Sequence, residues 1–325
     1  MIYLFSVIAC FVGFIIGYVY RWRGVPFVGK WKTPFIGKER RYTIGIYTGN
    51  SNNNFSLREY AINPVLVPSD VNDVNASFLA DPFLFMYCNK WFMFMEVMNR
   101  NRRLGEIGYA TSIDGIKWAY QSIVLREAFH LSYPFVFEYA GEIWMVPETS
   151  ADSSVRLYRS IDFPNKWKFE KKLLEGYKFT DASIFQHDDS WWMFVSRNRS
   201  EDLLLFFADK LTGPWLMHPQ SPVVYAKPDK ARCAGRPICL NGKMVRFSQD
   251  CDQEYGRSVR AFGVEELNRS RFRETELYEF PILYPSKDGW NANGMHHIDL
   301  HVLPDNSYLA AVDGCQIVRV VGLKY

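Results

Sequence analysis

The sequence predicts an all-β protein, a five-bladed β-propeller preceded by one N-terminal transmembrane helix. From residue 40 onward, short runs of β-branched and aromatic residues alternate with Gly, Asn, Asp and Pro, as in strands joined by turns. A pattern of about fifty residues recurs five times along this region, which is typical of a repeat architecture. The first twenty residues, in contrast, carry no charged side chain.

The uncharged stretch at residues 1–20, "MIYLFSVIACFVGFIIGYVY", is long enough to cross a hydrocarbon core of about 30 Å as a helix. We therefore expect a membrane anchor here, followed by a juxtamembrane linker at residues 21–40. Arg21 and Arg23 follow the span directly, so the positive-inside rule predicts a single-pass protein whose globular region faces the cytoplasm. A cleaved secretory signal and a buried helix are the alternatives.

The repeats lie within residues 41–325, which we assign to the propeller. Each copy has a head residue, a proline or small residue, an apolar strand, a turn with Asn, Asp or Gly, and a second strand rich in apolar residues. The copies start 48 to 64 residues apart. They are "DPFLFMYCNKWFMFMEV" from Asp81, "YPFVFEYAGEIWMVPET" from Tyr133, "DASIFQHDDSWWMFVSR" from Asp181, "GRPICLNGKMVRFSQD" from Gly235 and "DLHVLPDNSYLAAVDG" from Asp299.

A second repeated motif supports blades of four antiparallel strands. "TSIDGIKW", "RSIDFPNKW" and "FADKLTGPW" place an aspartate shortly before a tryptophan, in register with the first repeat. Two inner strands, a third strand and an outer strand near each tryptophan make one blade. Residues 40–78 are expected to close the ring with the C-terminal "CQIVRVVGL". A β-sandwich is the alternative fold, and the repeat-equivalent Trp91, Trp144, Trp191 and Trp192 are expected in the core between blades.

Composition excludes several functional classes. The net charge is +3, with 38 basic and 35 acidic residues and no clustered basic stripe, so nucleic-acid binding is not expected. The six cysteines include no CxxC pair, so neither a zinc site nor a disulfide framework is predicted.

The repeat heads are predicted to converge in space. In a propeller the first strand of each blade lines the central channel, so the same end of all five strands opens into one funnel. Asp81, Tyr133, Asp181, Arg236 and Asp299 would face this funnel, and His296 and His297 immediately precede the last head. A buried carboxylate is costly without a partner, so a channel position explains Asp81 in its apolar strand.

The motifs "NPVL.PSDVNDV.ASF.ADPF", "FHLSYPFVFE", "VPE", "RLYRS", "AGRP" and "GMHHID.H" extend over roughly residues 60–314. Here the chain resembles the propeller domain at the N-terminus of plant glucosamine inositolphosphorylceramide transferases, which also occurs in bacterial polysaccharide-locus proteins. That domain is similar in fold to glycoside hydrolase families 43, 32 and 68. The plant proteins carry their recognised glycosyltransferase domain after the propeller, so the activity of that domain does not carry over.

The resemblance to the hydrolase families implies a catalytic carboxylate at Asp81 and a supporting one at Asp181. Those families have a glutamate acid on a later blade, where this chain has Arg236. Glycosidic bond cleavage needs such an acid beside a carboxylate. Glu148, Asp250 and Asp299 are candidates, although Glu148 could instead pair with an arginine such as Arg156, and aspartates in loops often cap turns.

Other polar and aromatic residues are candidates for substrate binding. Arg236 could receive the phosphate of a nucleotide sugar or a lipid, or pair with Asp181 or Asp299. His296, His297 and Asp299 could bind sugar hydroxyls or a divalent cation, although no cofactor is required by the sequence. The remaining candidates are His130, Ser132 and Tyr133 at the funnel rim, Asp250 in its loop, and Trp290 for stacking on a sugar ring.

These patterns predict a carbohydrate-active enzyme that performs glycosyl transfer in the synthesis of a cell-surface polysaccharide or glycolipid. Its partners would be a carbohydrate or glycolipid, a nucleotide sugar as donor, and the membrane through residues 1–20. A glycoside hydrolase and a non-catalytic glycan-binding propeller are the two alternatives.

Overall fold

The computed structural model describes residues 33–50, 56–197 and 201–324. These residues form five antiparallel sheets in which four strands follow one another in line, so the prediction of an all-β five-bladed propeller is confirmed. The ring lies in a compact unit, Arg40–Ile317, and β1 and β21 continue beyond it into a second unit. The anchor predicted at residues 1–20 lies outside the described residues.

Blades one to three follow the sequence order. Blade one consists of β3 (Ala76–Tyr87), β4 (Lys90–Asn99), β5 (Leu104–Ser112) and β6 (Ala119–Leu125). Blade two consists of β7 (Ser132–Tyr139), β8 (Glu142–Thr149), β9 (Ser154–Asp162) and β10 (Lys166–Glu175). Blade three consists of β11 (Thr180–His187), β12 (Ser190–Arg197), β13 (Asp202–Ala208) and β14 (Leu216–Met217). Two short 3-10 turns, Pro68–Asp70 and Ser150–Asp152, lie between strands.

Blades four and five are less regular. Blade four consists of β15 (Arg232–Cys233), β17 (Lys243–Asp250), β18 (Ser258–Leu267) and β19 (Phe272–Glu276), and β16 (Ile238–Leu240) also pairs with β17. Blade five takes β20 (Ile298–Val302) and β21 (Ser307–Lys324) from the C-terminal region, and β1 (Thr33–Asn50) and β2 (Ser56–Glu59) from the N-terminal region. The ring is therefore closed by pairing of β1 with β21, as the sequence predicted.

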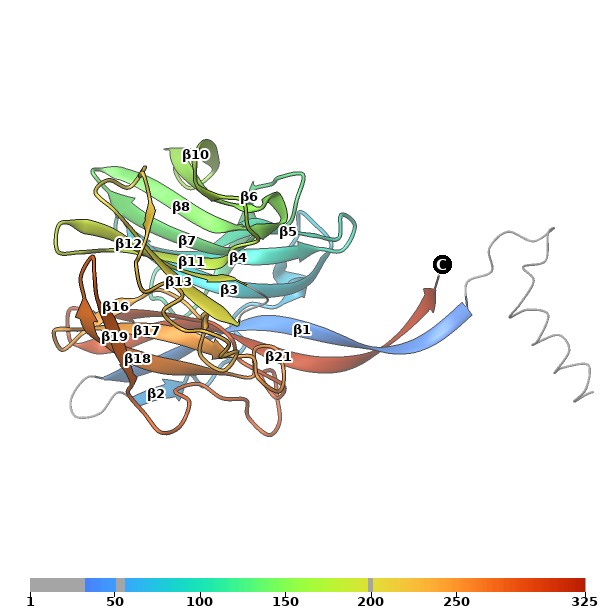
Figure 1. Ribbon diagram of the computed structural model, residues 1–325. Helices are drawn as coiled ribbons and strands as arrows, with labels where there is room; N and C mark the ends of the chain where they lie inside the picture. Colours follow the sequence, from blue (N-terminus) through green and yellow to red (C-terminus); the bar gives the residue numbers. More distant parts are fainter. Residues whose placement is uncertain (1–32, 51–55, 198–200, 325) are drawn as a thin grey trace, which may run out of the picture. The chain divides into compact units, whose positions relative to one another are not determined.

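The first strands of the blades line the centre of the ring. β3 contacts β7, β7 contacts β11, β11 contacts β15, and β20 contacts β3. Ile298 in β20 donates a backbone hydrogen bond of 2.8 Å to Ala234 beside β15, which completes the circuit. In Figure 1, β7 runs beside β11 and close to β3 near the middle of the ring.

Apolar side chains fill the spaces between blades. Trp91, Trp191 and Trp192 are buried, and the partly buried Trp144 packs against the same core as Trp191. The prediction that these tryptophans form core is thus confirmed.

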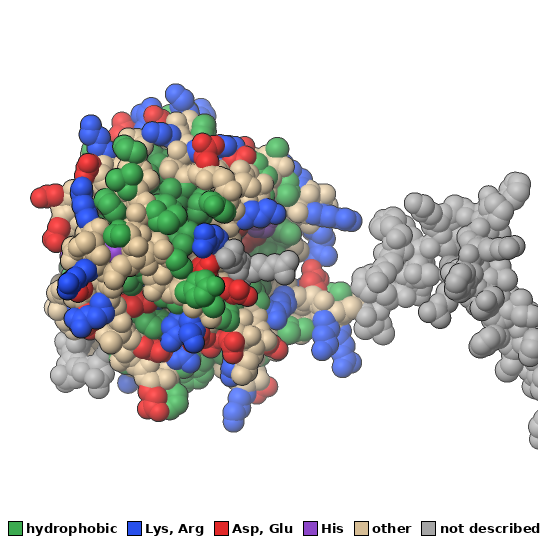
Figure 2. Space-filling view, viewed as in Figure 1, with side chains coloured by type: hydrophobic (Ala, Val, Ile, Leu, Met, Phe, Trp, Pro, Cys, Tyr) green, Lys and Arg blue, Asp and Glu red, His purple; other side chains and the backbone are tan. Residues whose placement is uncertain are grey.

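The face of the molecule shown in Figure 2 carries acidic and basic side chains side by side, with apolar side chains between them. Among the residues that the structure describes, none belongs to a helix that is long and apolar enough to span a membrane.

Candidate active site

A β-bulge recurs at the heads of the first three blades. The register shifts between Ala80 and Phe83, between Ser132 and Phe135, and between Thr180 and Ser183. The heads within these bulges, Asp81, Tyr133 and Asp181, have positive φ angles of 53°, 46° and 54°. Such angles are uncommon for residues other than glycine, and strain of this kind is characteristic of functional sites. The bulges also accommodate Pro82 and Pro134, which cannot donate to a strand ladder.

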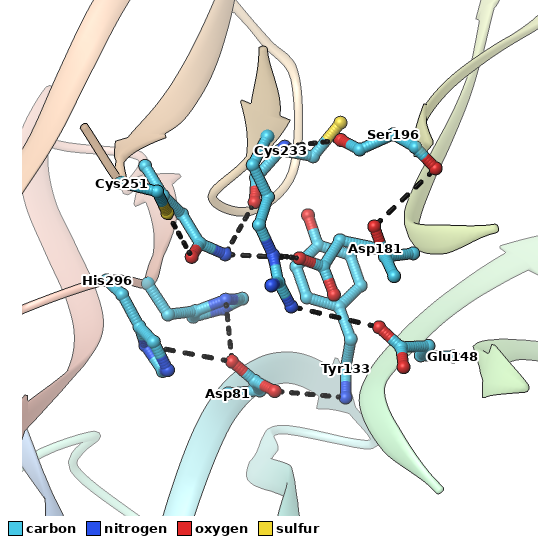
Figure 3. Close-up of polar contacts among 12 residues, drawn as sticks. Asp81, Tyr133, Glu148, Asp181, Ser196, Cys233, Cys251 and His296 are labelled. Atoms are coloured by element: carbon cyan, nitrogen blue, oxygen red, sulfur yellow. Dashed lines mark hydrogen bonds and ion pairs between the residues drawn. The ribbon is translucent and has the colours of Figure 1, made fainter. Parts of the chain in front are cut away.

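A second row of polar residues lies on the second strands, opposite the bulges. Glu96 pairs in register with Ala80, Glu148 with Ser132, Ser196 with Thr180, and Gln249 with Arg232. Each of these partners directly precedes a head position. The heads and the second-strand residues therefore build one polar cluster from different blades, and Figure 3 shows Asp81, Asp181, Glu148 and His296 pointing toward one another.

Asp81 is held by groups from blades two and five. Its Oδ2 accepts a 3.2 Å hydrogen bond from the backbone N–H of Tyr133, and its own N–H donates to Oδ2 of Asp313 at 3.1 Å. Oδ1 of Asp313 accepts the N–H groups of His296 and His297 at 3.0 and 3.1 Å. Asp313 therefore fixes the two histidines and Asp81 in one arrangement, and Nδ1 of each histidine lies within 3.9 Å of Oδ1 of Asp81.

The two histidines differ in charge. Burial alone would lower the pKa of His296, but the Asp313 carboxylate outweighs it and raises this pKa above the usual value. Burial lowers the pKa of His297 to about 4, so its imidazole is neutral at physiological pH. Nε2 of His297 lies 3.1 Å from the carbonyl oxygen of Pro82 and must carry the proton to bond to it. Nδ1 of His297 is then an acceptor, and it has no hydrogen-bond partner among the described residues.

Arg232 links the carboxylates of blades two and three. Its Nε donates to Oδ2 of Asp181 at 2.5 Å, and its Nη2 lies 3.9 Å from Oε2 of Glu148. Gln249 also donates to Oδ2 of Asp181, at 3.1 Å, and to the carbonyl oxygen of Cys233 at 2.8 Å. Oδ2 of Asp181 therefore accepts two side-chain hydrogen bonds, whereas Oε2 of Glu148 has no hydrogen-bond partner within the described segments of the chain.

Burial raises the pKa values of Asp81 and Glu148 in this cluster. It raises the pKa of Asp81 to about 7, against the opposing effect of His296. It raises the pKa of Glu148 to about 8, and the neighbouring Asp181 acts in the same direction. Both carboxyl groups therefore exchange protons near neutral pH. Carboxyl groups tuned in this way can serve as acid and base in one reaction.

Arg236 and Asp299 form a pair outside this cluster. Nε of Arg236 donates to Oδ1 of Asp299 at 2.9 Å, and its guanidinium also donates to the carbonyl oxygen of Val136. Asp299 accepts further hydrogen bonds from His301 and from the N–H of Leu84. Arg236 and His301 hold the pKa of Asp299 below its usual range despite burial. Of the two roles considered for Arg236, the structure gives it that of a partner for Asp299.

The other predicted residues are spread around the cluster. Ser132 lies opposite Glu148, and His130 lies beside Glu96, with 3.3 Å between Nε2 and Oε1. Asp250, at the end of β17, accepts the N–H of Asp252, so it caps a turn. Trp290 packs close to Gly45 and Gly314 and donates to Glu59 at 2.5 Å, which places its ring on β1 and β21.

The sequence left open a divalent cation near His296, His297 and Asp299. The donor atoms that lie within 4.8 Å of one another belong instead to Asp81, His296 and Asp313. In this set Nδ1 of His296 already lies 2.6 Å from Oδ2 of Asp313. A metal ion would have to displace that contact, so the geometry fits an imidazolium–carboxylate pair better than a metal site.

Sequence reasoning missed Arg232, Glu96, Gln249 and Asp313. Glu96 could have been predicted from the sequence, because "FMEV" and "VPET" place Glu96 and Glu148 at the same position of two repeats. Gln249 lies near the end of β17, and Asp313 in β21 directly follows Val312, which pairs with Ile298 at the start of β20. Arg232 was missed because the fourth repeat was aligned on Gly235, whereas the pairing of Arg232 with Gln249 makes Cys233 the equivalent of Asp81. In blade five the pairing of β20 with β21 begins at Ile298 and Val312, so Asp299 lies inside the ladder and His296 and His297 directly precede it.

Residues 34–315 match the family model described as the N-terminal region of glucosamine inositolphosphorylceramide transferase 1. The chain belongs to this family. Within the glucosamine inositolphosphorylceramide transferase N-terminal family, it is 35% identical over 282 residues to the rice protein of that name and 31% identical over 304 residues to the protein from Arabidopsis thaliana. These matches cover 83% and 86% of this chain but only 37% and 39% of the relatives.

Solved structures confirm the relation of this family's propeller to glycoside hydrolases in fold. A thermostable family-43 glycoside hydrolase superposes with a TM-score of 0.54 at 16% identity, covering 76% of this chain and 93% of the hydrolase. Identity at this level shows a shared fold and does not by itself transfer an activity.

Proposed function

We propose that the chain is a carbohydrate-active enzyme that transfers a glycosyl group to an acceptor hydroxyl by acid–base catalysis. The observation that carries the proposal is the convergence of Asp81 and Glu148 on one polar cluster around Asp181 and Arg232, with the pKa of both groups raised by desolvation, to about 7 for Asp81 and about 8 for Glu148. Both belong to a cluster built on strained strand heads, where such pKa shifts commonly mark chemistry.

In the proposed reaction Glu148 is the general acid and Asp81 the general base. The acceptor oxygen attacks the anomeric carbon as the bond to the leaving oxygen breaks. Glu148 gives its proton to the leaving oxygen, and Asp81 takes the proton of the acceptor hydroxyl. Asp81 then returns a proton to Glu148 through solvent, which restores the starting state. Asp181 is a positioning group in this scheme, because Arg232 and Gln249 both donate to its Oδ2.

A glycolipid or polysaccharide is the proposed substrate. Support comes from the name that the relatives carry, which describes transfer of glucosamine to an inositolphosphorylceramide. We also propose that residues 1–20 anchor the chain with its propeller on the cytoplasmic side, since basic residues follow this uncharged stretch. A nucleotide sugar is less well supported as donor, because Arg236, the arginine expected to receive a phosphate, is already paired with Asp299.

The second candidate is a glycoside hydrolase, favoured by the shared fold with family 43. The two reactions differ only in whether the acceptor is an alcohol or water. Incubation of the full-length protein with aryl glycosides and with nucleotide sugars, with and without a glycoside acceptor, separates them. Glycoside products elongated by one sugar support transfer, and release of free sugar at the same rate with and without acceptor supports hydrolysis. No turnover of any donor by the wild type would leave a binding module.

A further inference from the structure

Tyr255 is an aromatic residue that contacts the polar cluster but has no part in the proposed reaction. It lies between β17 and β18 of blade four, and its side chain is 42% exposed. Its ring is nearly perpendicular to that of His296, with 5.4 Å between the centroids, and the guanidinium of Arg232 lies 4.9 Å from its centre. The exposed ring is therefore in direct contact with the partners of Asp313 and Asp181.

Protein encloses the Tyr255 side chain in part. Desolvation raises the pKa of Tyr255 well above its usual value, although the positive charge of Arg232 opposes the shift. The side chain of Arg232, which lies against this ring, is itself 14% exposed. An aromatic surface that stays open to solvent beside a few polar groups is what small-molecule sites typically present.

The position of the Tyr255 ring is fixed by the loop that carries it. Nη1 of Arg40 donates a 2.8 Å hydrogen bond to the carbonyl oxygen of Tyr255. The next residue, Gly256, has a φ of 65°, and a Cβ atom there would lie 2.7 Å from Cβ of His296. Glycine thus lets the loop pack directly against the histidine. Because the ring is already positioned, a ligand that binds to it orders little of the protein, which favours affinity.

We propose that the ring of the reacting sugar stacks on Tyr255, which makes this tyrosine a substrate-binding residue of the site. The C–H groups on one side of a sugar ring form an apolar surface, and the face of an aromatic ring carries partial negative charge that attracts them. His296, which contacts Tyr255, has its Nδ1 3.9 Å from Oδ1 of Asp81. Arg232, on the same ring, has its Nη2 3.9 Å from Oε2 of Glu148. A sugar held on Tyr255 therefore lies beside both the proposed base and the proposed acid.

Shielding of charged groups is the other role that such a ring could have. A tyrosine that only covers Arg232 and His296 would contribute to stability and would not distinguish one ligand from another. A tyrosine that binds a sugar ring needs its aromatic face for affinity and does not need its hydroxyl group. Tyr255→Phe keeps this face, Tyr255→Leu keeps an apolar side chain without it, and Tyr255→Ala removes both.

The inference rests on the proposed function only for the assumption that the ligand is a sugar. The full-length protein, in micelles of a detergent without a sugar headgroup, is titrated with methyl β-glucoside, methyl β-galactoside, methyl α-mannoside and sorbitol, and binding is followed by saturation-transfer difference NMR. We expect at least one glycoside to bind, with saturation strongest on the C–H protons of one ring face, and sorbitol, which has no ring, to bind about tenfold more weakly. Tyr255→Ala and Tyr255→Leu should weaken glycoside binding about tenfold, whereas Tyr255→Phe should retain it. Tyr87→Ala, the same change at a tyrosine that is 40% exposed at the end of β3, should retain it too.

Wild-type affinity in Tyr255→Leu would overturn the inference, as would sorbitol binding as tightly as the glycosides, or no binding of any glycoside by the wild type. A loss in Tyr255→Phe as large as that in Tyr255→Ala would do so too, because the hydroxyl group would then be the binding group. If Tyr255→Ala does not fold, the comparison of Tyr255→Phe with Tyr255→Leu decides the matter. Ring-dependent binding without turnover of any glycoside would leave this inference standing and remove the proposed function. Turnover with the same KM in the wild type and Tyr255→Leu would do the reverse.

Discussion

Nδ1 of His296 lies 2.6 Å from Oδ2 of Asp313, and both side chains are buried. Asp313 also accepts the backbone N–H groups of Asp81, His296 and His297, so one carboxylate orients the base and both histidines. His296 lowers the pKa of Asp313, although burial alone would raise it. The pair is therefore an ionised, positioning element beneath the proposed reacting groups.

Breaking this pair should destabilise the fold. Asp313→Asn removes the negative charge but keeps an acceptor, and it leaves the His296 imidazole without its counter-ion. We expect a loss of about 3 kcal/mol in the free energy of unfolding, as for other buried pairs that lose one partner. Urea unfolding of the variant, with the exposed Asp305→Asn as control, measures the effect. A loss no larger than that of the control would show that the pair is not a stabilising element.

The stability of the protein should fall as the pH rises from about 6.5 to 8. Asp81 and Glu148 have pKa values of about 7 and 8 in the folded chain, above those of unfolded carboxyl groups. The folded state thus holds protons that the unfolded state has released, and this advantage disappears as the pH passes the folded pKa values. His297 acts in the opposite sense, but only between about 4 and its ordinary pKa.

Chemical unfolding at a series of pH values tests this dependence. The double variant Asp81→Asn, Glu148→Gln should show a flatter profile above about pH 6.5, since its amides do not titrate. A wild-type profile that is flat or rises through this window would mean that the two carboxyl groups are not protonated in the folded chain.

Arg236 should matter for stability and not for the reaction. Arg236→Met leaves the Asp299 carboxylate buried without the guanidinium that pairs with it, so we expect the protein to lose about 3 kcal/mol of stability. Adding Asp299→Asn should recover some of this loss, because the uncompensated charge is then gone. The same kcat for the wild type and the folded single variant would separate this pair from the active site. A kcat reduced a hundredfold in both variants would place Arg236 in the chemistry after all.

The sequence predicted the propeller because the blades repeat, and each copy had to present the same apolar pattern to its neighbours. Ring closure was also predictable, since the N-terminal strands had no partner other than the C-terminal ones. The register of the strands in blades four and five could not be predicted from the sequence. "CAGRP" lacks the Asp-Pro or Tyr-Pro signature of a bulge, so the fourth head was placed at Gly235 instead of Cys233.

The alignment of the repeats also decided which site residues could be predicted from the sequence. Asp81, Asp181 and Glu148 lie in regular repeats and converge as expected. Arg236 and Asp299 were assigned to the funnel because the fourth and fifth repeats were aligned on Gly235 and Asp299. The pairing of Arg232 with Asp181 depends on contacts between blades three and four, which are distant in sequence, so no local pattern could reveal it.

The proposed reaction depends most on Glu148 as the proton donor, and the pH dependence of kcat/KM tests this role most directly. With a donor turned over by the wild type, we predict a narrow bell whose acidic and alkaline limbs fall near pH 7 and 8. Glu148→Gln should lower kcat/KM by about 10²–10⁴ and remove the alkaline limb, because the amide has no proton to lose. A Glu148→Gln variant that retains wild-type kcat/KM and both limbs would contradict the account.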